Sequence, residues 1–316
     1  MARVLITRLA LAVPMLLGMS VLVFLIIRLV PGDPVLAVLG LNATPELVAR
    51  LREDLGLNDP IYVQYFHWLA DILRGDFGLD YRSNEPIGRM LLDRLPVTIE
   101  LAGLSLLIAI VAAVPLGVLA ALRRRRVADK GTQVLSLVGI SVPDFWLGIM
   151  LILVFSLGLG LLPSSGFVPL DQNPVENVRH MLLPSVALAA GLAAVLIRIT
   201  RAAMLDVLHQ DHIRFTRAKG VAEPAVIFKH ALRNAAIPIV TVIGLQAGYL
   251  LGGAIVIEQV FALPGVGRLV LDSVLQRNYP VVQASVLMVG IMFVLTNLAA
   301  DLLYVVLNPK LRTSGQ

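Results

Sequence analysis

Six long runs of apolar residues alternate with polar segments along this chain. They cover about 9–30, 97–122, 132–161, 182–203, 236–257 and 281–306. A helix of about 20 apolar residues crosses the hydrocarbon core of a bilayer, where the backbone must satisfy its own hydrogen bonds. Strands of a membrane barrel would alternate apolar and polar residues, and these runs do not. The pattern predicts an all-α integral membrane protein with six transmembrane helices.

Composition favours the same class of protein. Of the 316 residues, 58% are hydrophobic and only 15% are charged, so a soluble globule would expose large apolar patches. The first run is longer than a signal-peptide core and lacks a small-residue cleavage site after it, which predicts a retained anchor. The chain contains no cysteine, and this excludes disulfides and thiolate metal sites.

The positive charges predict the orientation in the membrane. All four lysines and the four arginines at 123–126 fall on the side that also holds both termini. Cytoplasmic loops carry the excess of Lys and Arg, so we expect a multi-pass protein with cytoplasmic N- and C-termini. The arginine run is interpreted as fixing a short cytoplasmic turn. We expect no nucleic-acid partner, because aromatic or groove-reading residues are absent nearby.

The polar segments divide the chain into three parts. Residues 1–30 hold the cytoplasmic N-terminal end and the first helix, 31–95 form an extracytoplasmic helical insert, and 96–316 form the core with its other five helices. In the insert, Thr44 can cap a helix that Pro45 begins, and Gly56 sits where that helix would stop.

A second amphipathic helix is expected in the insert from about 61 to 73. Its aromatic residues suit a membrane interface: Tyr62, Tyr65, Phe66 and Trp68. The insert is either a packing cap over the helix ends or a docking surface for an outside partner, and the sequence leaves both open.

A basic loop at about 204–236 lies on the predicted cytoplasmic side. Glu223 followed by Pro224 predicts the first turn of a helix. One face of that helix would be apolar: Ala225, Phe228, Leu232, Ala235 and Ala236. Such a helix would either contact a cytoplasmic subunit or rest on the lipid headgroups.

Just before this helix, small residues are flanked by charges. Ala218 and Gly220 would let another surface approach closely, and Arg217 and Lys219 stand beside them. A small-residue tip carried on two membrane helices is what a mechanical contact to a cytoplasmic subunit requires.

These residues resemble a known family. "RAKG" at 217–220 and "HALRNAAIPIVTVIG" at 230–244 are similar to the coupling-loop signature of membrane-spanning subunits of binding-protein-dependent ABC importers, in the dipeptide and oligopeptide permease branch. Further similar segments are "RLVPGDP" at 28–34, "LRGDFGLDYRSNEPI" at 73–87, "VIEQVFALPGVGRL" at 256–269, "RNYPVVQ" at 277–283 and "LNPKLR" at 307–312. The general signature opens with Glu-Ala-Ala, where this chain has Arg214, Phe215 and Thr216.

The resemblance implies a fold, partners and a role for the loop. It implies the permease fold of type I ABC importers in a bacterial inner membrane, with a second related permease, two ATPase subunits and an extracytoplasmic substrate-binding protein as partners. Ala218, Lys219 and Gly220 would form the tip that docks on an ATPase subunit, with Arg217 beside them. The branch implies dipeptides or oligopeptides as substrates, and glutathione or nickel as alternatives.

No motor or catalytic centre is predicted in this chain. It has no Gly-rich phosphate loop ending in Gly-Lys-Ser or Gly-Lys-Thr, so we expect a transporter subunit without a cofactor, whose ATP and Mg²⁺ are bound by partner ATPases. His209 and His212 would offer at most two ligands from one helix face, so no metal site is expected. An ion-driven secondary transporter and a membrane-embedded enzyme remain as other classes, although the inverted repeats or reactive clusters they favour are not visible.

Polar residues within the apolar runs are candidates for lining a pathway, because a charge in a membrane span is costly unless paired or hydrated. Asp144 follows Pro143, which should bend the third span. Asp144, Gln246 and Tyr249 could face the pathway, or could serve as structural pairs between helices. The pathway itself is expected at the interface with the second permease.

Overall fold

The computed structural model describes residues 2–29, 44–54 and 58–307. Within these ranges the regular elements are helices, and the only extended pairing is an isolated bridge between Leu79 and Pro86. The elements in order are α1 (Ala2–Leu29), α3 (Pro45–Asp54), α4 (Ile61–Leu73), α5 (Ile87–Leu122), α6 (Val127–Ser141), α7 (Asp144–Leu151), the π-helix η2 (Ile152–Gly158), α8 (Pro174–Leu208), α9 (Asp211–Ala218), α10 (Glu223–Ala225), the π-helix η3 (Val226–Ala231), α11 (Leu232–Val260), α12 (Val266–Leu275) and α13 (Tyr279–Leu307). The all-α prediction is confirmed.

Four helical segments of the described chain are long and apolar enough to cross a membrane. They are α5, α8, the continuous stretch Glu223–Val260 and the stretch Tyr279–Leu302 of α13. The bent pair formed by α6 and α7 with η2 makes a fifth if it is counted as one span. The first predicted run, 9–30, lies mostly in α1, a helix of 28 residues whose stretch Ala10–Leu25 is apolar.

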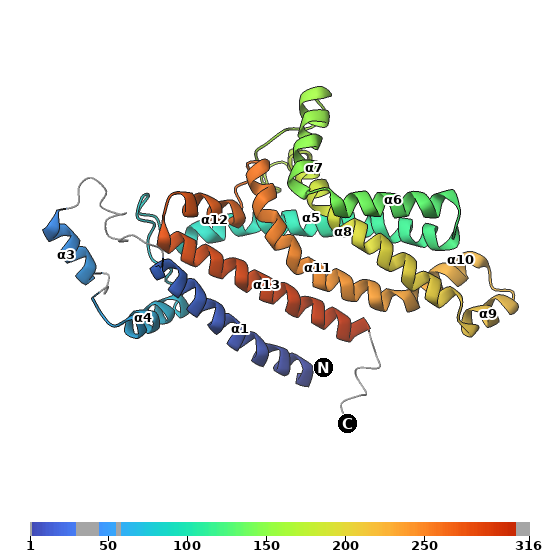
Figure 1. Ribbon diagram of the computed structural model, residues 1–316, viewed down its shortest axis with the longest axis horizontal. Helices are drawn as coiled ribbons and strands as arrows, with labels where there is room; N and C mark the ends of the chain where they lie inside the picture. Colours follow the sequence, from blue (N-terminus) through green and yellow to red (C-terminus); the bar gives the residue numbers. More distant parts are fainter. Residues whose placement is uncertain (1, 30–43, 55–57, 308–316) are drawn as a thin grey trace.

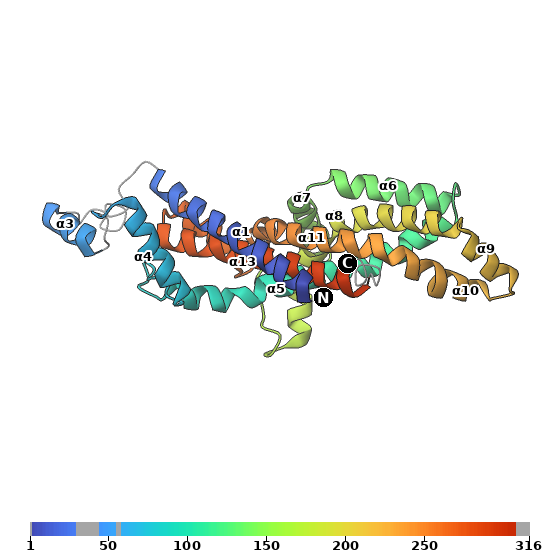
Figure 2. The same cartoon turned by 90° about the horizontal axis from the view of Figure 1, so that it is seen from below.

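The helices form an elongated bundle with different structures at its two ends. In Figure 1, α3, α4 and α12 lie at one end, and α9 and α10 lie at the other; Figure 2 shows the same separation of α3 and α4 from α9 and α10. Helix α8 packs along α5, α11 packs between α8 and α13, and α1 lies along α13. The N-terminal end of α1 and the C-terminal end of α13 both point towards the end that carries α9 and α10. The molecule therefore separates the insert from the basic loop by the full length of the bundle.

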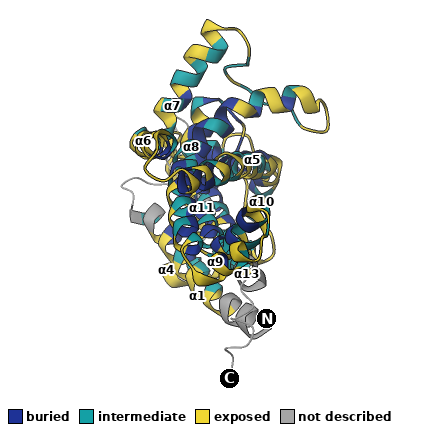
Figure 3. Cartoon of the chain, turned by 90° about the vertical axis from the view of Figure 1, so that its right-hand side faces the viewer, coloured by how far each residue is buried: buried dark blue, intermediate teal, exposed yellow. Residues whose placement is uncertain are grey.

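The main core lies where α5, α8 and α11 meet. Its buried side chains are mostly aliphatic and include Leu101, Ala109, Leu192, Leu196 and Ala254. Helices α5 and α8 approach closely at Gly117, where an added Cβ would lie 2.6 Å from Cβ of Thr200. Small residues at such crossings let membrane helices pack backbone to backbone. By contrast, Figure 3 colours α6 and α7 mostly exposed or intermediate.

The third predicted span is broken. Helices α6 and α7 meet at 102°, and Figure 1 shows α7 leaving the bundle almost at right angles to it. Val142 has an extended backbone (φ −86°, ψ 123°) directly before Pro143, because a residue before proline is disfavoured in the helical region and proline donates no hydrogen bond. The predicted bend at Pro143 is confirmed, and within the predicted run 132–161 it separates α6 from α7 and η2.

The insert packs against the first helix. Thr44 caps α3 as predicted, since its Oγ1 accepts a hydrogen bond of 3.3 Å from the backbone N–H of Leu47. Gly56 lies outside the described residues. Helix α4 has the predicted bounds, and the Tyr65 ring lies 5.2 Å from the Phe24 ring of α1.

Polar contacts reinforce this attachment of α4. The Tyr65 hydroxyl shares a hydrogen bond of 2.9 Å with Ser20, and the Arg28 guanidinium donates two to Oε1 of Gln64. Tyr62 and Phe66 remain exposed. Two of the four aromatic residues assigned to a membrane interface therefore stay available for it, while Tyr65 and Trp68 pack on Phe24.

Candidate coupling and pathway sites

The predicted coupling tip is a tight turn between α9 and α10. Helix α9 ends as the N–H of Lys219 bonds to the carbonyl of Phe215 and that of Gly220 bonds to Arg217. Gly220 has φ +74°, the left-handed conformation with which helices commonly end at glycine. A Cβ added there would meet nothing within 4 Å. Glycine is thus required for the backbone, and the space around it is open.

An ion pair closes the base of this turn. The Arg217 guanidinium donates to both carboxylate oxygens of Glu223, at 3.1 and 2.6 Å. Both side chains are about half exposed, and such surface pairs add only about 0–1 kcal/mol to stability. The pair therefore acts mainly on the shape of the segment 218–222. Arg217 was predicted as a flanking charge, and the structure shows it bound within the loop.

The turn stands on a packed base. Ile213 of α9 and Val226 of η3 are fully buried with Met204 of α8 and Val118 of α5. Motion of the tip must therefore involve the ends of two membrane helices, because close-packed side chains transmit displacement rather than absorb it.

The predicted apolar face of the helix after Glu223 is wrong at Phe228. This side chain is 64% exposed, whereas Val226, Ile227 and Ala231 are buried. The cause is η3, because a π-helical turn holds an extra residue and shifts the face that later residues present. Phe215 is also 63% exposed, with the Lys219 ammonium 4.5 Å from its ring centre. Two aromatic side chains are thus exposed around the loop.

The structure brings the three predicted pathway residues into one pocket. Asp144 of α7 and Gln246 and Tyr249 of α11 line a space of about 270 Å³. Leu188, Gly191 and Leu192 of α8 complete its wall with Leu250. Tyr249 is 74% exposed. The pocket lies where α7, α8 and α11 meet, and its role in a pathway stays a prediction.

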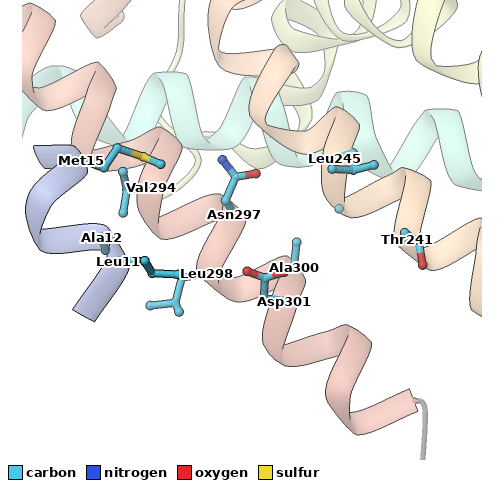
Figure 4. Close-up of a pocket in the computed structure, with 11 residues that line it drawn as sticks. Leu11, Ala12, Met15, Thr241, Leu245, Val294, Asn297, Leu298, Ala300 and Asp301 are labelled. Carbon is cyan, nitrogen blue, oxygen red and sulfur yellow. The ribbon is translucent and has the colours of Figure 1, made fainter. Parts of the chain in front are cut away.

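A larger cavity lies between α1, α11 and α13. It has a volume of about 530 Å³ and mostly apolar walls, to which α1 contributes Leu11 and Met15. Figure 4 shows Asn297 and Asp301 of α13 as its polar residues, with Thr241 at the edge on α11. Asp301, near the C-terminal end of α13, therefore lines this cavity.

Sequence reasoning missed a buried ion pair at the start of α6. Asp129 is 2% exposed, and Nε and Nη2 of Arg201 on α8 donate to its two oxygens at 2.5 and 3.0 Å. The backbone N–H of Arg125 and the amide of Gln133 also donate to it. The available signal was a lone acid three positions after the last of four consecutive arginines. The pair fixes the turn after α5 to α8.

Glu258 lies near the C-terminal end of α11, one residue after the predicted apolar run 236–257. It is fully buried, and its carboxylate accepts hydrogen bonds from the Thr98 hydroxyl at 2.6 Å and the Arg268 N–H at 2.8 Å. The Thr98 oxygen in turn accepts from the Val266 N–H at 2.9 Å. This Glu258 cluster ties α5 and α11 to the beginning of α12. No local pattern shows that residues 160 positions apart meet.

A second polar cluster holds the insert to the start of α13. Asp80 accepts hydrogen bonds from the Arg82 N–H, the Ser83 hydroxyl and the Asn278 amide. Burial opposes ionisation of Asp80, but these donors outweigh it and lower the pKa of the carboxyl below its ordinary value. The carboxylate is therefore the form that the fold stabilises.

The two histidines of the basic loop, His209 and His212, have different hydrogen-bond partners. Nδ1 of His209 lies 2.6 Å from the carbonyl oxygen of Leu205, and Nε2 of His212 lies 3.3 Å from the amide nitrogen of Asn234. Among the residues that the structure describes, no group of three His, Asp or Glu side chains is arranged to hold a metal ion.

The sequence is similar to known membrane components of transport systems over nearly its whole length. Residues 113–313 match the binding-protein-dependent transport system inner membrane component, and residues 1–102 match the N-terminal part of such membrane components. A peptide transport system permease protein of Brucella abortus (strain 2308) is 42% identical over 312 residues, 99% of each chain. The glutathione transport system permease protein GsiC of Salmonella choleraesuis (strain SC-B67) is 43% identical over 300 residues, 95% of each chain.

A solved structure supports the fold. The MetNI methionine ABC transporter in an inward-facing conformation contains a chain that superposes with a TM-score of 0.58 at 19% identity, covering 69% of this chain and 96% of that one. The matched families cover most of the sequence, and the relatives are similar over nearly its whole length. This chain therefore belongs to the binding-protein-dependent transport system inner membrane components, as a membrane-spanning permease subunit of an ABC importer of the peptide family.

Proposed function

We propose that this permease imports peptides that an extracytoplasmic binding protein delivers, with energy from ATPase subunits on the cytoplasmic side. The observation that carries the substrate class is the pair of relatives, whose names specify peptide transport and transport of glutathione, itself a tripeptide. Both relatives match over nearly the whole chain. Peptide-like solutes are therefore the substrates that the sequence supports best, and glutathione is the specific alternative.

The coupling step is assigned to the turn that holds Arg217, Ala218, Lys219 and Gly220. It lies at the end of the bundle opposite the insert (Figure 1), on a base of buried residues from α5, α8 and η3. The tip is small and open, and exposed Phe215 and Phe228 offer apolar area around it. Closure of an ATPase subunit on this turn would move α8 and the helix that begins at Glu223 together. ATP and Mg²⁺ would be bound by that subunit.

A second permease is proposed on the exposed side of α11. Leu245, Tyr249, Gly252 and Val256 are exposed at helical spacing and form one stripe. The Asp144 pocket opens on the same helix. A related permease on this stripe would place the pocket between two subunits, where a translocation pathway needs polar groups. Both termini would lie on the cytoplasmic side.

Reconstitution tests the proposal directly. Proteoliposomes holding the assembled importer should take up labelled peptide with ATP inside and loaded binding protein outside. Vesicles that hold this chain alone should not. Uptake by the chain alone, or uptake driven by an ion gradient without ATP, would overturn the proposal. Calorimetry on the binding protein encoded alongside, with peptides and glutathione as ligands, separates the two substrates.

Replacement of Gly220 tests the coupling turn. Gly220→Trp should lower ATP-dependent uptake about 30-fold, because a bulky side chain at the centre of an interface costs 2 kcal/mol or more. Gly160→Trp is the matched control, since Gly160 also has a positive φ (+63°) and open space around it but lies after η2, away from this turn. Membrane insertion should be equal in both variants. Normal uptake by the Gly220→Trp variant would remove the assignment.

A further inference from the structure

The carboxylate of Asp144 lies between two other helices. An added Cβ at Gly191 of α8 would lie 3.3 Å from one carboxylate oxygen, and one at Gly253 of α11 would lie 3.7 Å from the other. Larger residues at these two positions would crowd the carboxylate. The side chain is half buried at the first turn of α7, so both oxygens reach into the space shared by α7, α8 and α11.

No hydrogen bond or ion pair joins this carboxylate to any residue that the structure describes, and the pocket around it holds no Lys, Arg or His. The other buried acids of the bundle are satisfied, Asp129 by Arg201 and Glu258 by Thr98 and backbone N–H groups. An unpaired charge in a membrane span is costly and usually marks a substrate or ion pathway. Asp144 therefore lacks the structural partner that its neighbours in the fold possess.

The rest of the pocket suits a cationic group with several N–H donors. The ring of Tyr249 is largely exposed and can attract a cation through its face. The side-chain oxygen of Gln246 can accept a further hydrogen bond. Leucines at 188, 192 and 250 keep the remaining wall apolar. A primary ammonium matches this set, because it carries one positive charge and three donors.

We propose that Asp144, with Gln246 and Tyr249, binds the N-terminal ammonium group of the peptide as it passes through the importer. This inference rests on the proposed peptide import and adds a chemical requirement to it, a free amine. The carboxylate end of the peptide would be repelled by Asp144, so the amino end would occupy the pocket. A divalent metal ion fits less well, because one carboxylate and one amide oxygen are fewer than the six or more ligands that hard cations take.

The test compares two solutes of nearly equal shape in the assembled importer in proteoliposomes. Trialanine has an N-terminal ammonium, and lactyl-dialanine has a neutral hydroxyl in its place. Calorimetry first establishes concentrations at which the binding protein is saturated with each, so that delivery is equal. The wild-type importer should move trialanine about tenfold faster or more, since a hydrogen bond to a charged group contributes about 1.5–3 kcal/mol.

Substitutions then assign the preference to one side chain. Asp144→Asn should lower trialanine uptake to the rate of lactyl-dialanine and leave the rate of lactyl-dialanine unchanged. Asp144→Glu keeps the charge and should keep the preference. Asp301→Asn is the matched control, because it removes another carboxylate of the bundle at a different cavity (Figure 4), and it should keep the preference as well.

Each alternative outcome has a definite meaning. Equal rates for the two solutes in the wild type, or a preference that survives in Asp144→Asn, would overturn the ammonium site while leaving peptide import intact. Loss of uptake of both solutes in Asp144→Asn, with normal assembly and ATP hydrolysis, would also overturn it. Asp144 would then be needed for the movement of the helices and not for binding the ammonium group. No uptake of either solute by the wild type from a saturated binding protein would reject the proposed function itself.

Discussion

At the scale of single residues, the acids of the bundle differ in how the fold treats them. Asp129 and Glu258 are buried and receive several hydrogen bonds each, whereas Asp144 receives none from the described residues. Burial of a carboxylate is tolerated only when donors replace the lost water. Paired acids therefore hold helices together, and the unpaired acid is available for a ligand.

Removal of one partner from the Asp129–Arg201 pair should destabilise the fold. Asp129→Asn should lower the free energy of unfolding by about 3 kcal/mol, because the Arg201 charge is left largely buried without a carboxylate. Thermal unfolding in detergent, followed by tryptophan fluorescence, measures the loss. The exposed pair of Asp211 and Arg214, 3.7 Å apart, gives the control, and Asp211→Asn should cause no measurable change. Equal midpoints for the two variants would contradict this role of the pair.

At the scale of elements, contacts at small residues decide how the helices pack. Gly117 lets α5 and α8 touch, and Gly244 does the same for α11 and α13, where an added Cβ would lie 2.6 Å from Cβ of Ala300. No such restriction exists at Gly103 of α5, which has no neighbour within 4 Å. The same residue type on the same helix therefore has different structural consequences.

Replacement of these two glycines should separate packing from helix propensity. Gly117→Ala should destabilise the bundle by about 1–3 kcal/mol, because overpacking forces α5 away from α8. Gly103→Ala should be neutral or slightly stabilising, because alanine favours a helix by about 1 kcal/mol over glycine. Unfolding midpoints of both variants in the same detergent provide the comparison. A Gly117→Ala variant as stable as Gly103→Ala would show that the close approach is not required.

Periodicity predicted the helices well because it depends only on local spacing. It located α4 and placed the basic loop between α8 and α11, and the proline at 143 marked the bend in the third run. It failed at Phe228, since a π-helical turn alters the spacing on which the prediction rests. It also missed the partners of Asp129 and Glu258, which lie 72 and 160 positions away. Asp144, Gln246 and Tyr249 could each be named as candidates from the sequence. That they line one pocket could be seen only in the tertiary structure.

At the scale of the whole molecule, the two ends of the bundle carry different structures. One end carries the insert, α12 and the Glu258 cluster, and the other carries the turn at Gly220 and its ion pair. Helices α5, α8 and α11 contribute buried side chains to both of the packed clusters that lie along the bundle. A displacement at the turn can therefore reach the Asp144 pocket through α8 and α11, which both line it.

Exchange of the charges in the Arg217–Glu223 pair should reveal whether the shape of the turn matters for transport. Arg217→Glu and Glu223→Arg should each reduce the peptide moved per ATP hydrolysed, because like charges would open the base of the turn. The double exchange should recover part of the loss, with a coupling energy of about 0.5–1 kcal/mol. Uptake and ATP hydrolysis measured on the same proteoliposomes give this ratio. Additive losses in the double variant would mean that each charge acts on the ATPase subunit alone.

The Glu258 cluster has a consequence for how such an importer admits its cargo. Thr98, Glu258 and the first residues of α12 are joined by hydrogen bonds that no water can readily replace, because the group is completely enclosed. These bonds should make α5, α11 and the beginning of α12 move as one unit. Under the proposed function, an opening at that end of the bundle would require these three helices to tilt together.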